Sequence, residues 1–385
     1  VVLDRDADAA ANAIRHAEGL EDGAIKKKRS TDEKKAEIVG RITATDDYSK
    51  LSDVDMVIEA VFEDSAVKKT VTELAEAHMP EDAIYASNTS TIPITDLSKF
   101  SKRPEQFVGI HFFSPVDKML LVEVIKTTDT GDRAIAMALD YIAKIKKTPI
   151  VVNDTRGFYV NRCVLRYMGE AYNMLTEGVP AAMIENLAKQ AGMPLGPLQL
   201  NDETAIDLAH KIIHQAIRDL GDGIVDKRTL EVVNLMVEKH ERFGRKNGKG
   251  FYDYPDKPAK KKLWPGLKDL YPQQDPDDID QQEIKDRFHA AIAVEAARCV
   301  EEGVVTDVRE ADVGSILGFG FAPFTGGALS YIDGMGTAKF VELLQKLEPK
   351  YGDQFKPNKL LLEMAKNNEL FYERFAPEAQ KKKAA

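Results

Sequence analysis

The sequence predicts an α/β protein: a doubly wound, mostly parallel sheet, truncated at its amino terminus, followed by two related all-helical domains. Short apolar segments alternate with helical stretches over about the first 150 residues, and only helical periodicity follows Thr155. Motifs of one helical segment also recur in the other. The expected domains are 1–153 for the sheet, 154–254 for the first helical domain, 255–280 for a connector and 281–385 for the second.

The strands and helices of the sheet domain follow from apolar runs and helical spacing. The expected strands are 1–4, 41–45, 55–61, 83–87, 107–113, 121–125 and 149–152, and the expected helices are 7–28, 65–78 and 132–147. The run 55–61 is nearly continuous in apolar residues, which is typical of a strand buried on both faces. Ligands of such sheets bind at the carboxyl ends of the strands, so residues there are the candidates for a site.

The helical part contains an internal repeat with an offset of 125 to 126 residues. The matching pairs are Glu170 with Glu295, Glu177 with Glu302, Gly196 with Ala322, and Ile206 with Ile332. A constant offset over about forty residues indicates a duplicated helical domain. The prolines and charges between the two copies predict a connector, in which Lys260, Lys261 and Lys262 form a solvated face.

Composition excludes several classes of protein. The 385 residues carry a formal net charge of −10, which argues against a nucleic-acid coat and a membrane-surface protein. No apolar run is long enough to span a membrane, and we expect no signal peptide. With only two cysteines we expect a reducing, cytoplasmic location, the mitochondrial matrix being the alternative. The chain starts without methionine inside a strand, so we expect a piece of a longer polypeptide.

His111 and Glu123 are the first candidates for chemistry. The strand that ends near His111 turns and returns as the strand that contains Glu123. Such a pair of strands brings a carboxylate beside an imidazole and fixes its tautomer and basicity. The alternative is a hydrogen-bonded core histidine with no catalytic role. Asp4, at the end of the first strand, is either a ligand of a ribose hydroxyl or a helix N-cap.

Five stretches together resemble a known family over nearly the full length. They are 57–63 (VIEAVFE), 87–91 (SNTST), 111–115 (HFFSP), 154–162 (DTRGFYVNR) and 248–252 (GKGFY). In this order and spacing the chain resembles the 3-hydroxyacyl-CoA dehydrogenase part of multifunctional fatty-acid β-oxidation enzymes. The duplicated helical domain is similar to that of the α-subunit type. The resemblance implies a Rossmann-type domain, NAD as cofactor and an acyl-CoA substrate.

The resemblance also implies roles for individual residues. His111 would be the general base that takes the proton of the 3-hydroxyl, and Glu123 would orient the ring and stabilise the imidazolium. Ser90 and Asn161 would hydrogen-bond the substrate oxygen and the cofactor region; on residue type alone they are a turn former and a helix cap. The implied cofactor-binding residues are Asp4, Ala60, Val61, Glu63, Lys68, Asn88, Ser90 and Ser114. An acid at Asp4 favours NAD over NADP.

Parts of the family pattern lie outside this sequence. The first strand with its glycine-rich turn and the enoyl-CoA hydratase half are not in the chain. Without that turn we expect weaker NAD binding, with an inactive fragment as one outcome. Without the first strand we expect an exposed sheet edge beside the second strand of the family pattern. Expected partners are the hydratase half and a thiolase subunit. Two alternatives stay open: a dehydrogenase of a small hydroxy acid without CoA, and a non-catalytic scaffold for a thiolase, against which the His111 and Glu123 pair argues.

Overall fold

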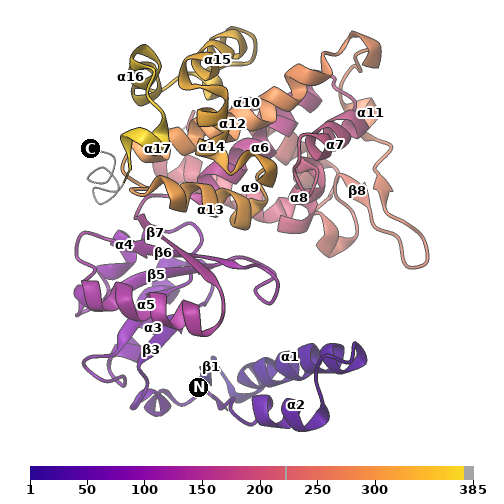
Figure 1. The fold of residues 1–385 in the computed structure, drawn as a ribbon. Coiled ribbons are helices and arrows are strands. Elements are labelled where there is room, and N and C mark those ends of the chain that lie inside the picture. The colour runs from indigo at the N-terminus through magenta and orange to yellow at the C-terminus, as the bar shows by residue number, and fades with distance from the viewer. Residues whose placement is uncertain (222, 377–385) are drawn as a thin grey trace. The chain divides into compact units, whose positions relative to one another are not determined.

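The computed structural model describes residues 1–221 and 223–376, which group into two units (Figure 1). The first unit contains Val1–Phe112, Glu123–Pro149 and Asp154–Arg156, and the second contains Phe113–Val122, Ile150–Asn153 and Gly157–Ala385. No helix among the described residues is both long and apolar enough to cross a membrane.

The strands form a mostly parallel sheet, as the sequence predicts. Five strands lie in the order β3 (Met56–Glu59), β4 (Ile84–Ser87), β5 (Phe107–Phe112), β6 (Leu121–Lys126) and β7 (Thr148–Asn153). The pairs β3–β4 and β4–β5 are parallel. A separate two-stranded parallel sheet consists of β1 (Val2–Leu3) and β2 (Ala44–Thr45). In the described chain β1 pairs only with β2, and β3 only with β4.

This division of the sheet changes the environment of β3. The sequence predicts a strand buried on both faces, but Met56, Val57 and Ile58 are only half-buried. The expectation is therefore wrong for these three residues. An edge strand has a neighbour on one side only, so its apolar side chains keep part of their surface exposed.

The helices of the first unit are α1 (Ala7–Lys26), α2 (Asp32–Val39), α3 (Ser65–Glu76), α4 (Ile94–Ser98) and α5 (Asp132–Lys144). Apart from α2 and α4, they match the predicted helices. Helix α2 has no buried residue, and therefore lacks the apolar periodicity by which helices are recognised. Helix α3 begins where the Asp64 carboxylate accepts hydrogen bonds from the backbone N–H groups of Ala66 and Val67.

The second unit is mainly helical. Its helices are α6 (Val160–Thr176), α7 (Ala181–Gln190), α8 (Pro197–Thr204), α9 (Ile206–Leu220), α10 (Lys227–Asn234), α11 (Leu267–Leu270), α12 (Gln281–Glu301), α13 (Val308–Phe319), α14 (Ala328–Met335), α15 (Thr337–Tyr351), α16 (Lys359–Asn367) and α17 (Phe371–Arg374). The expected connector contributes the strand β9 (Lys262–Leu263), which pairs antiparallel with β8 (Tyr252–Asp253). Helix α12 is buried over most of its circumference and forms the centre of this unit.

A buried ion pair joins α12 to α6. Arg287 is 1% exposed. Its Nε donates to Glu170 Oε1 over 2.6 Å, and its Nη1 donates to Glu177 Oε2 over 2.6 Å. The guanidinium also lies 3.6 Å from the ring centroid of Tyr351. Burial raises the pKa of Glu170 above its ordinary value, although the charge of Arg287 acts against this rise. The carboxylate therefore depends on Arg287 for compensation of its charge.

A second ion-pair cluster joins the same two helices, with the arginine now on α6 and its main carboxylate partner on α12. On α6, Arg162 Nε donates to Glu295 Oε1 of α12 over 2.9 Å, and its Nη1 donates to Glu302 Oε2. The offset is 125 residues in each case: Arg162 has the role of Arg287, Glu295 that of Glu170, and Glu302 that of Glu177. Helices α6 and α12 are thus joined by two related ion-pair clusters, of which the second also includes Arg166 and Arg298 beside Glu295.

A carboxylate–tyrosine contact is repeated as well. Glu185 accepts hydrogen bonds from N–H groups in the first turn of α8 and from the hydroxyl of Tyr252, the latter over 2.6 Å. Asp312 accepts from N–H groups in the first turn of α14 and from the hydroxyl of Tyr372 over 2.9 Å. From these matched contacts we propose that the unit contains two copies of one helical domain.

The glycines beside these carboxylates correct two predicted equivalences. A Cβ at Gly196 would lie 2.3 Å from Glu185, and a Cβ at Gly327 would lie 2.4 Å from Asp312. Gly196 therefore corresponds to Gly327, and its predicted match with Ala322 is wrong. The predicted match of Ile206 with Ile332 is also wrong, because Ile206 begins α9 whereas Ile332 lies in α14, which corresponds to α8. The offset is 131 residues at Gly196 but 125 residues at the ion pairs, so the second copy contains six more residues between these two points.

The buried ion pairs give a test of this arrangement. Arg287→Ala leaves Glu170 buried without its partner, and we expect it to lower the free energy of unfolding by about 3–5 kcal/mol. Arg162→Ala should lower it by less than Arg287→Ala, because two further arginines still pair with Glu295. The matched control is Arg309→Ala, since Arg309 is 54% exposed and pairs with Asp307 at the surface, where the loss should be at most about 1 kcal/mol. Urea unfolding measures the free energy of unfolding of the three variants. Equal losses in Arg287→Ala and Arg309→Ala would contradict a stabilising role of the buried ion pair.

Candidate active site

His111 and Glu123 lie on neighbouring strands of the sheet, on β5 and β6. The Nδ1 of His111 is 2.8 Å from Oε2 of Glu123. His111 is 5% exposed and Glu123 is fully buried. The proximity of imidazole and carboxylate that the sequence predicts is therefore confirmed. Burial also matters for its strength, because a charged hydrogen bond is stronger in a medium of low polarity than in water.

The geometry of this pair determines what the imidazole can do. An ionised carboxylate only accepts hydrogen bonds, so with Glu123 ionised the Nδ1 of His111 donates to it. The proton on Nδ1 makes Nε2 the basic nitrogen of the neutral ring. If Nε2 takes up a proton, the resulting imidazolium is stabilised by the adjacent negative charge. The pair is thus suited to general base catalysis.

Polar side chains at the ends of β3 and β4 hold the strands next to His111 in register. The Oγ of Ser87 donates to Glu59 Oε2 over 2.8 Å. The side-chain oxygen of Asn88, one residue beyond β4, accepts from the backbone N–H of Phe112 over 2.9 Å. Asn88 therefore fixes the end of β5 at the residue after His111.

Glu63 organises the loop that follows β4. Its Oε1 accepts from the hydroxyl of Thr89 over 2.6 Å, from the N–H of Ser90 over 3.0 Å and from the N–H of Thr91 over 2.9 Å. Burial raises the pKa of Glu63, but the hydrogen bond from Thr89 and the charge of Lys68 outweigh this and hold the pKa below its ordinary value. Glu63 thus remains a carboxylate that positions the predicted site residue Ser90.

Lys68 lies on α3 and is 1% exposed. Its Nζ is 2.8 Å from Oε1 of Glu59 and 3.4 Å from Oε2 of Glu63. A buried ammonium group needs such anionic partners, because an unpaired charge in the interior is strongly unfavourable. The resemblance implies that Lys68 binds the cofactor. In the structure its ammonium group binds protein carboxylates and thereby positions Glu63.

The other predicted residues are placed as follows. Ala60 and Val61 follow the end of β3, and the N–H of Val61 donates to Oε1 of Glu59 over 2.7 Å. Asp4 is exposed and follows β1, in the two-stranded sheet separate from the five-stranded one. Ser114 is an exposed residue between β5 and β6, and Asn161 lies in the first turn of α6. Both Ser114 and Asn161 belong to the second unit.

Two residues of this region were missed by the sequence reasoning. Glu59 connects Lys68 with β4. Glu59 could have been recognised in the sequence as an acidic residue inside an apolar strand, because a buried carboxylate needs a partner. Asp154 accepts from the N–H groups of Ile94 and Thr95 over 2.9 and 2.7 Å. Its side chain therefore holds the beginning of α4, which follows the loop that contains Ser90, although its sequence context offered no sign of this.

Two family descriptions match adjacent parts of the chain. The NAD-binding domain of 3-hydroxyacyl-CoA dehydrogenase matches residues 1–155, and the C-terminal domain of the same enzyme matches residues 157–254. The two descriptions meet within three residues of the boundary at which the sequence predicts the change from sheet to helices.

Known relatives agree with this result. The fatty acid oxidation complex subunit alpha of Shewanella amazonensis is 40% identical over 94% of this chain, and the chain spans about half (51%) of that relative's length. The (S)-3-hydroxybutyryl-CoA dehydrogenase of Ralstonia eutropha is 32% identical, with a TM-score of 0.59, over 66% of this chain and 89% of that one. The 3-hydroxybutyryl-CoA dehydrogenase of Escherichia coli K12 is 23% identical and supports the fold, with a TM-score of 0.79 over 95% of this chain and 93% of that one.

The carboxylate of Glu63 can be tested through the pH dependence of stability. Its pKa in the folded chain lies below the ordinary value of 4.5, so its contribution to stability is complete above that value and disappears as the pH falls through the lowered folded-state pKa. We expect Glu63→Gln to destabilise the fold most at about pH 7 and progressively less toward about pH 3. Urea unfolding of both proteins measures this, and a difference independent of pH would contradict the assignment.

Proposed function

The chain belongs to the 3-hydroxyacyl-CoA dehydrogenase family, and on this premise we propose that it oxidises (S)-3-hydroxyacyl-CoA to 3-ketoacyl-CoA with NAD⁺ as hydride acceptor. The observation that carries the proposal is the buried hydrogen bond between His111 and Glu123 in a chain with the NAD-binding domain of this family. Because the chain spans about half of its curated relatives, the activity of the longer protein is part of the same proposal.

The reaction requires that a proton and a hydride leave the same alcohol group. His111 Nε2 takes the proton of the C3 hydroxyl, and the bond between C3 and oxygen becomes a carbonyl. When bound, NAD⁺ supplies the acceptor for the hydride that leaves C3. Glu123 keeps the ring in the tautomer with a basic Nε2 and stabilises the imidazolium that forms. In the reverse direction His111 returns the proton as a general acid.

The residues at the strand ends fit the nicotinamide half of NAD. Parallel sheets bind nucleotides at the carboxyl ends of their strands, which is where Glu63, Asn88 and Ser90 lie. The Glu63 carboxylate is suited to accept a hydrogen bond from a ribose hydroxyl, with Lys68 positioning it from behind. The remaining proposed contacts are Ala60, Val61 and Ser114 for the cofactor, Asp4 for the adenosine ribose, and Ser90 and Asn161 for the substrate oxygen.

The printed name of the Shewanella amazonensis relative supports a proposal about assembly. That protein is the alpha subunit of a fatty acid oxidation complex and is about twice as long as the matched part. We infer that this chain forms the dehydrogenase part of such a subunit, with an enoyl-CoA hydratase half and a thiolase subunit as partners. Since this relative is bacterial, a cytoplasmic location is the corresponding expectation.

The role of His111 is tested by His111→Gln in the full-length protein. Glutamine retains hydrogen bonding but cannot accept the proton, so we expect hydride transfer to fall by roughly two to four orders of magnitude. Single-turnover formation of NADH measures this step, and fluorescence titration should show nearly unchanged NADH binding. The matched control is His16→Gln, because His16 is an exposed histidine of α1. Turnover like that of the wild type in His111→Gln would remove the residue from the mechanism.

The substrate class is tested separately, in the reverse direction. With NADH present, we expect the full-length wild-type protein to reduce acetoacetyl-CoA and to leave free acetoacetate essentially unreacted, because binding energy from the CoA moiety helps to position the reacting carbon. The rate of NADH oxidation is the measurement. Equal rates with both compounds would favour a dehydrogenase of small hydroxy acids, and no reaction with either would favour a scaffold without catalysis.

A further inference from the structure

We propose that His210, His214 and Glu238 form a binding site for a divalent transition-metal ion of the Zn²⁺ type. Among the residues that the structure describes, these three offer one ligand atom each, all within 4.8 Å of one another. None of them has a part in the proposed dehydrogenase reaction. Two imidazoles and one carboxylate are one of the ligand sets that bind Zn²⁺ in proteins.

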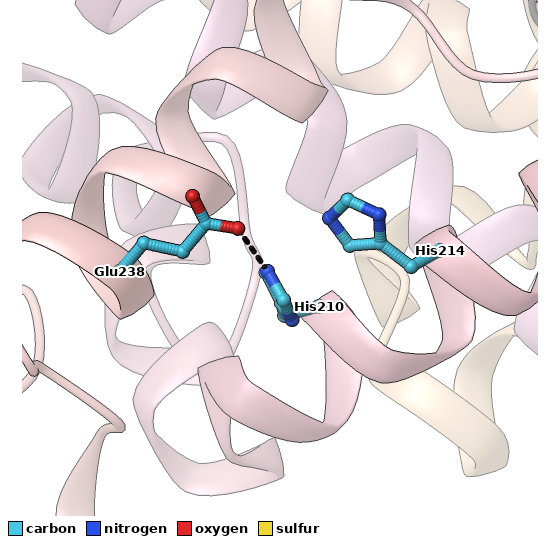
Figure 2. Close-up of side chains that lie close together, drawn as sticks. All are labelled: His210, His214 and Glu238. Atoms are coloured by element: carbon cyan, nitrogen blue, oxygen red, sulfur yellow. Dashed lines mark hydrogen bonds and ion pairs between the residues drawn. The ribbon is translucent and has the colours of Figure 1, made fainter.

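The two histidines lie one turn apart on α9, which places them on the same face of this helix. Their ring centroids are 4.3 Å apart, and the rings are tilted by 51°. Figure 2 shows a ring nitrogen of His214 turned toward the space between His210 and Glu238. Both rings are half-buried, so the helix presents them in restricted positions while one side of the cluster remains open to solvent.

The third ligand comes from a different element. Glu238 belongs to the π-helical turn η3 (Leu235–Lys239), which continues α10 and packs against α9. Its Oε1 lies 2.9 Å from Nε2 of His210 (Figure 2). A π-helical turn contains one extra residue, which rotates the following side chains relative to a regular α-helix. In η3, Glu238 points toward the histidines of α9.

A metal ion requires only small changes in this cluster. At Zn–N distances of about 2.0–2.1 Å, two ligands of a tetrahedral ion lie about 3.3 Å apart. The separation between Oε1 of Glu238 and Nε2 of His210, 2.9 Å, is shorter than this value, and the cluster allows separations of up to 4.8 Å, which are longer. Rotations of the partly exposed side chains are enough to reach about 3.3 Å.

Asn234 supports the orientation of the second ring. Its Oδ1 lies 3.0 Å from Nε2 of His214. This contact keeps Nε2 on the side of Glu238, which lies one turn after Asn234. When Zn²⁺ binds to Nε2, the proton of that nitrogen moves to Nδ1 or to solvent, and Asn234 becomes available as an oxygen ligand beside water.

The position of the ligands indicates what the ion does. A bound metal ion would connect α9 with η3 through side chains of both elements, so metal binding favours the folded state of this part of the helical unit. The carboxylate offsets one of the two positive charges of the ion, and both imidazoles bind as neutral rings. We therefore expect the ion to act on stability and to leave the proposed hydride transfer unaffected.

Titration with ZnCl₂ tests the proposal. The full-length protein, without a histidine tag and freed of metal with a chelator, is titrated by calorimetry in competition with a chelator of known affinity. We expect one Zn²⁺ per chain and a higher midpoint of thermal unfolding with Zn²⁺ present. His210→Ala and His214→Ala should each weaken binding at least about tenfold, since loss of a supporting group alone already weakens metal sites by this factor.

The control and a second variant separate this site from other binding. His78→Ala, at an exposed histidine of the first unit, should leave the affinity for Zn²⁺ unchanged. Glu238→Gln retains the size of an exposed side chain and should weaken binding even if the histidine variants fold poorly. Absence of Zn²⁺ binding, or binding of the same affinity in His210→Ala, His214→Ala and Glu238→Gln, would overturn the proposal.

Discussion

The hydrogen bond between His111 and Glu123 is the contact on which the proposed chemistry depends. A histidine alone on a buried strand is a weak base with two possible tautomers. A carboxylate 2.8 Å from Nδ1 makes one tautomer dominant and stabilises the charge that proton transfer creates. Because Glu123 is fully buried, solvent screens its interaction with the imidazole only weakly. The sheet places the two groups on neighbouring strands, where main-chain pairing limits their movement.

The polar groups at the strand ends supply the rigidity that this contact requires. Lys68 is held between Glu59 and Glu63, and Glu63 in turn holds the loop with Ser90. Such a network is costly to bury, and every partner must be present for it to be stable. The structure thus places charged groups where an enzyme needs fixed positions, although an apolar core of the same size would be easier to stabilise.

Sequence reasoning identified the parts that follow from short-range patterns. His111 and Glu123 were found because two strands joined by a short turn must lie side by side. Glu59 was missed because its partner Lys68 lies on a different element, and a charge inside an apolar run does not reveal its partner. Gly196 was matched with the wrong residue because extra residues between the elements of the second copy shift the offset locally. A cluster such as that of His210 and its neighbours depends on a π-helical turn, which has no simple sequence pattern.

The most direct test of the account is the tautomer of His111 at neutral pH. Nitrogen NMR of the protein labelled with ¹⁵N only in histidine reports which ring nitrogen carries the proton, and the His111→Gln protein identifies the resonances. We expect a protonated Nδ1 and an unprotonated Nε2, with the resonance of the Nδ1 proton shifted by its hydrogen bond to the carboxylate. In Glu123→Gln this preference should be lost. A ring protonated at Nε2 in the wild-type protein would contradict the proposed role of His111 as the general base.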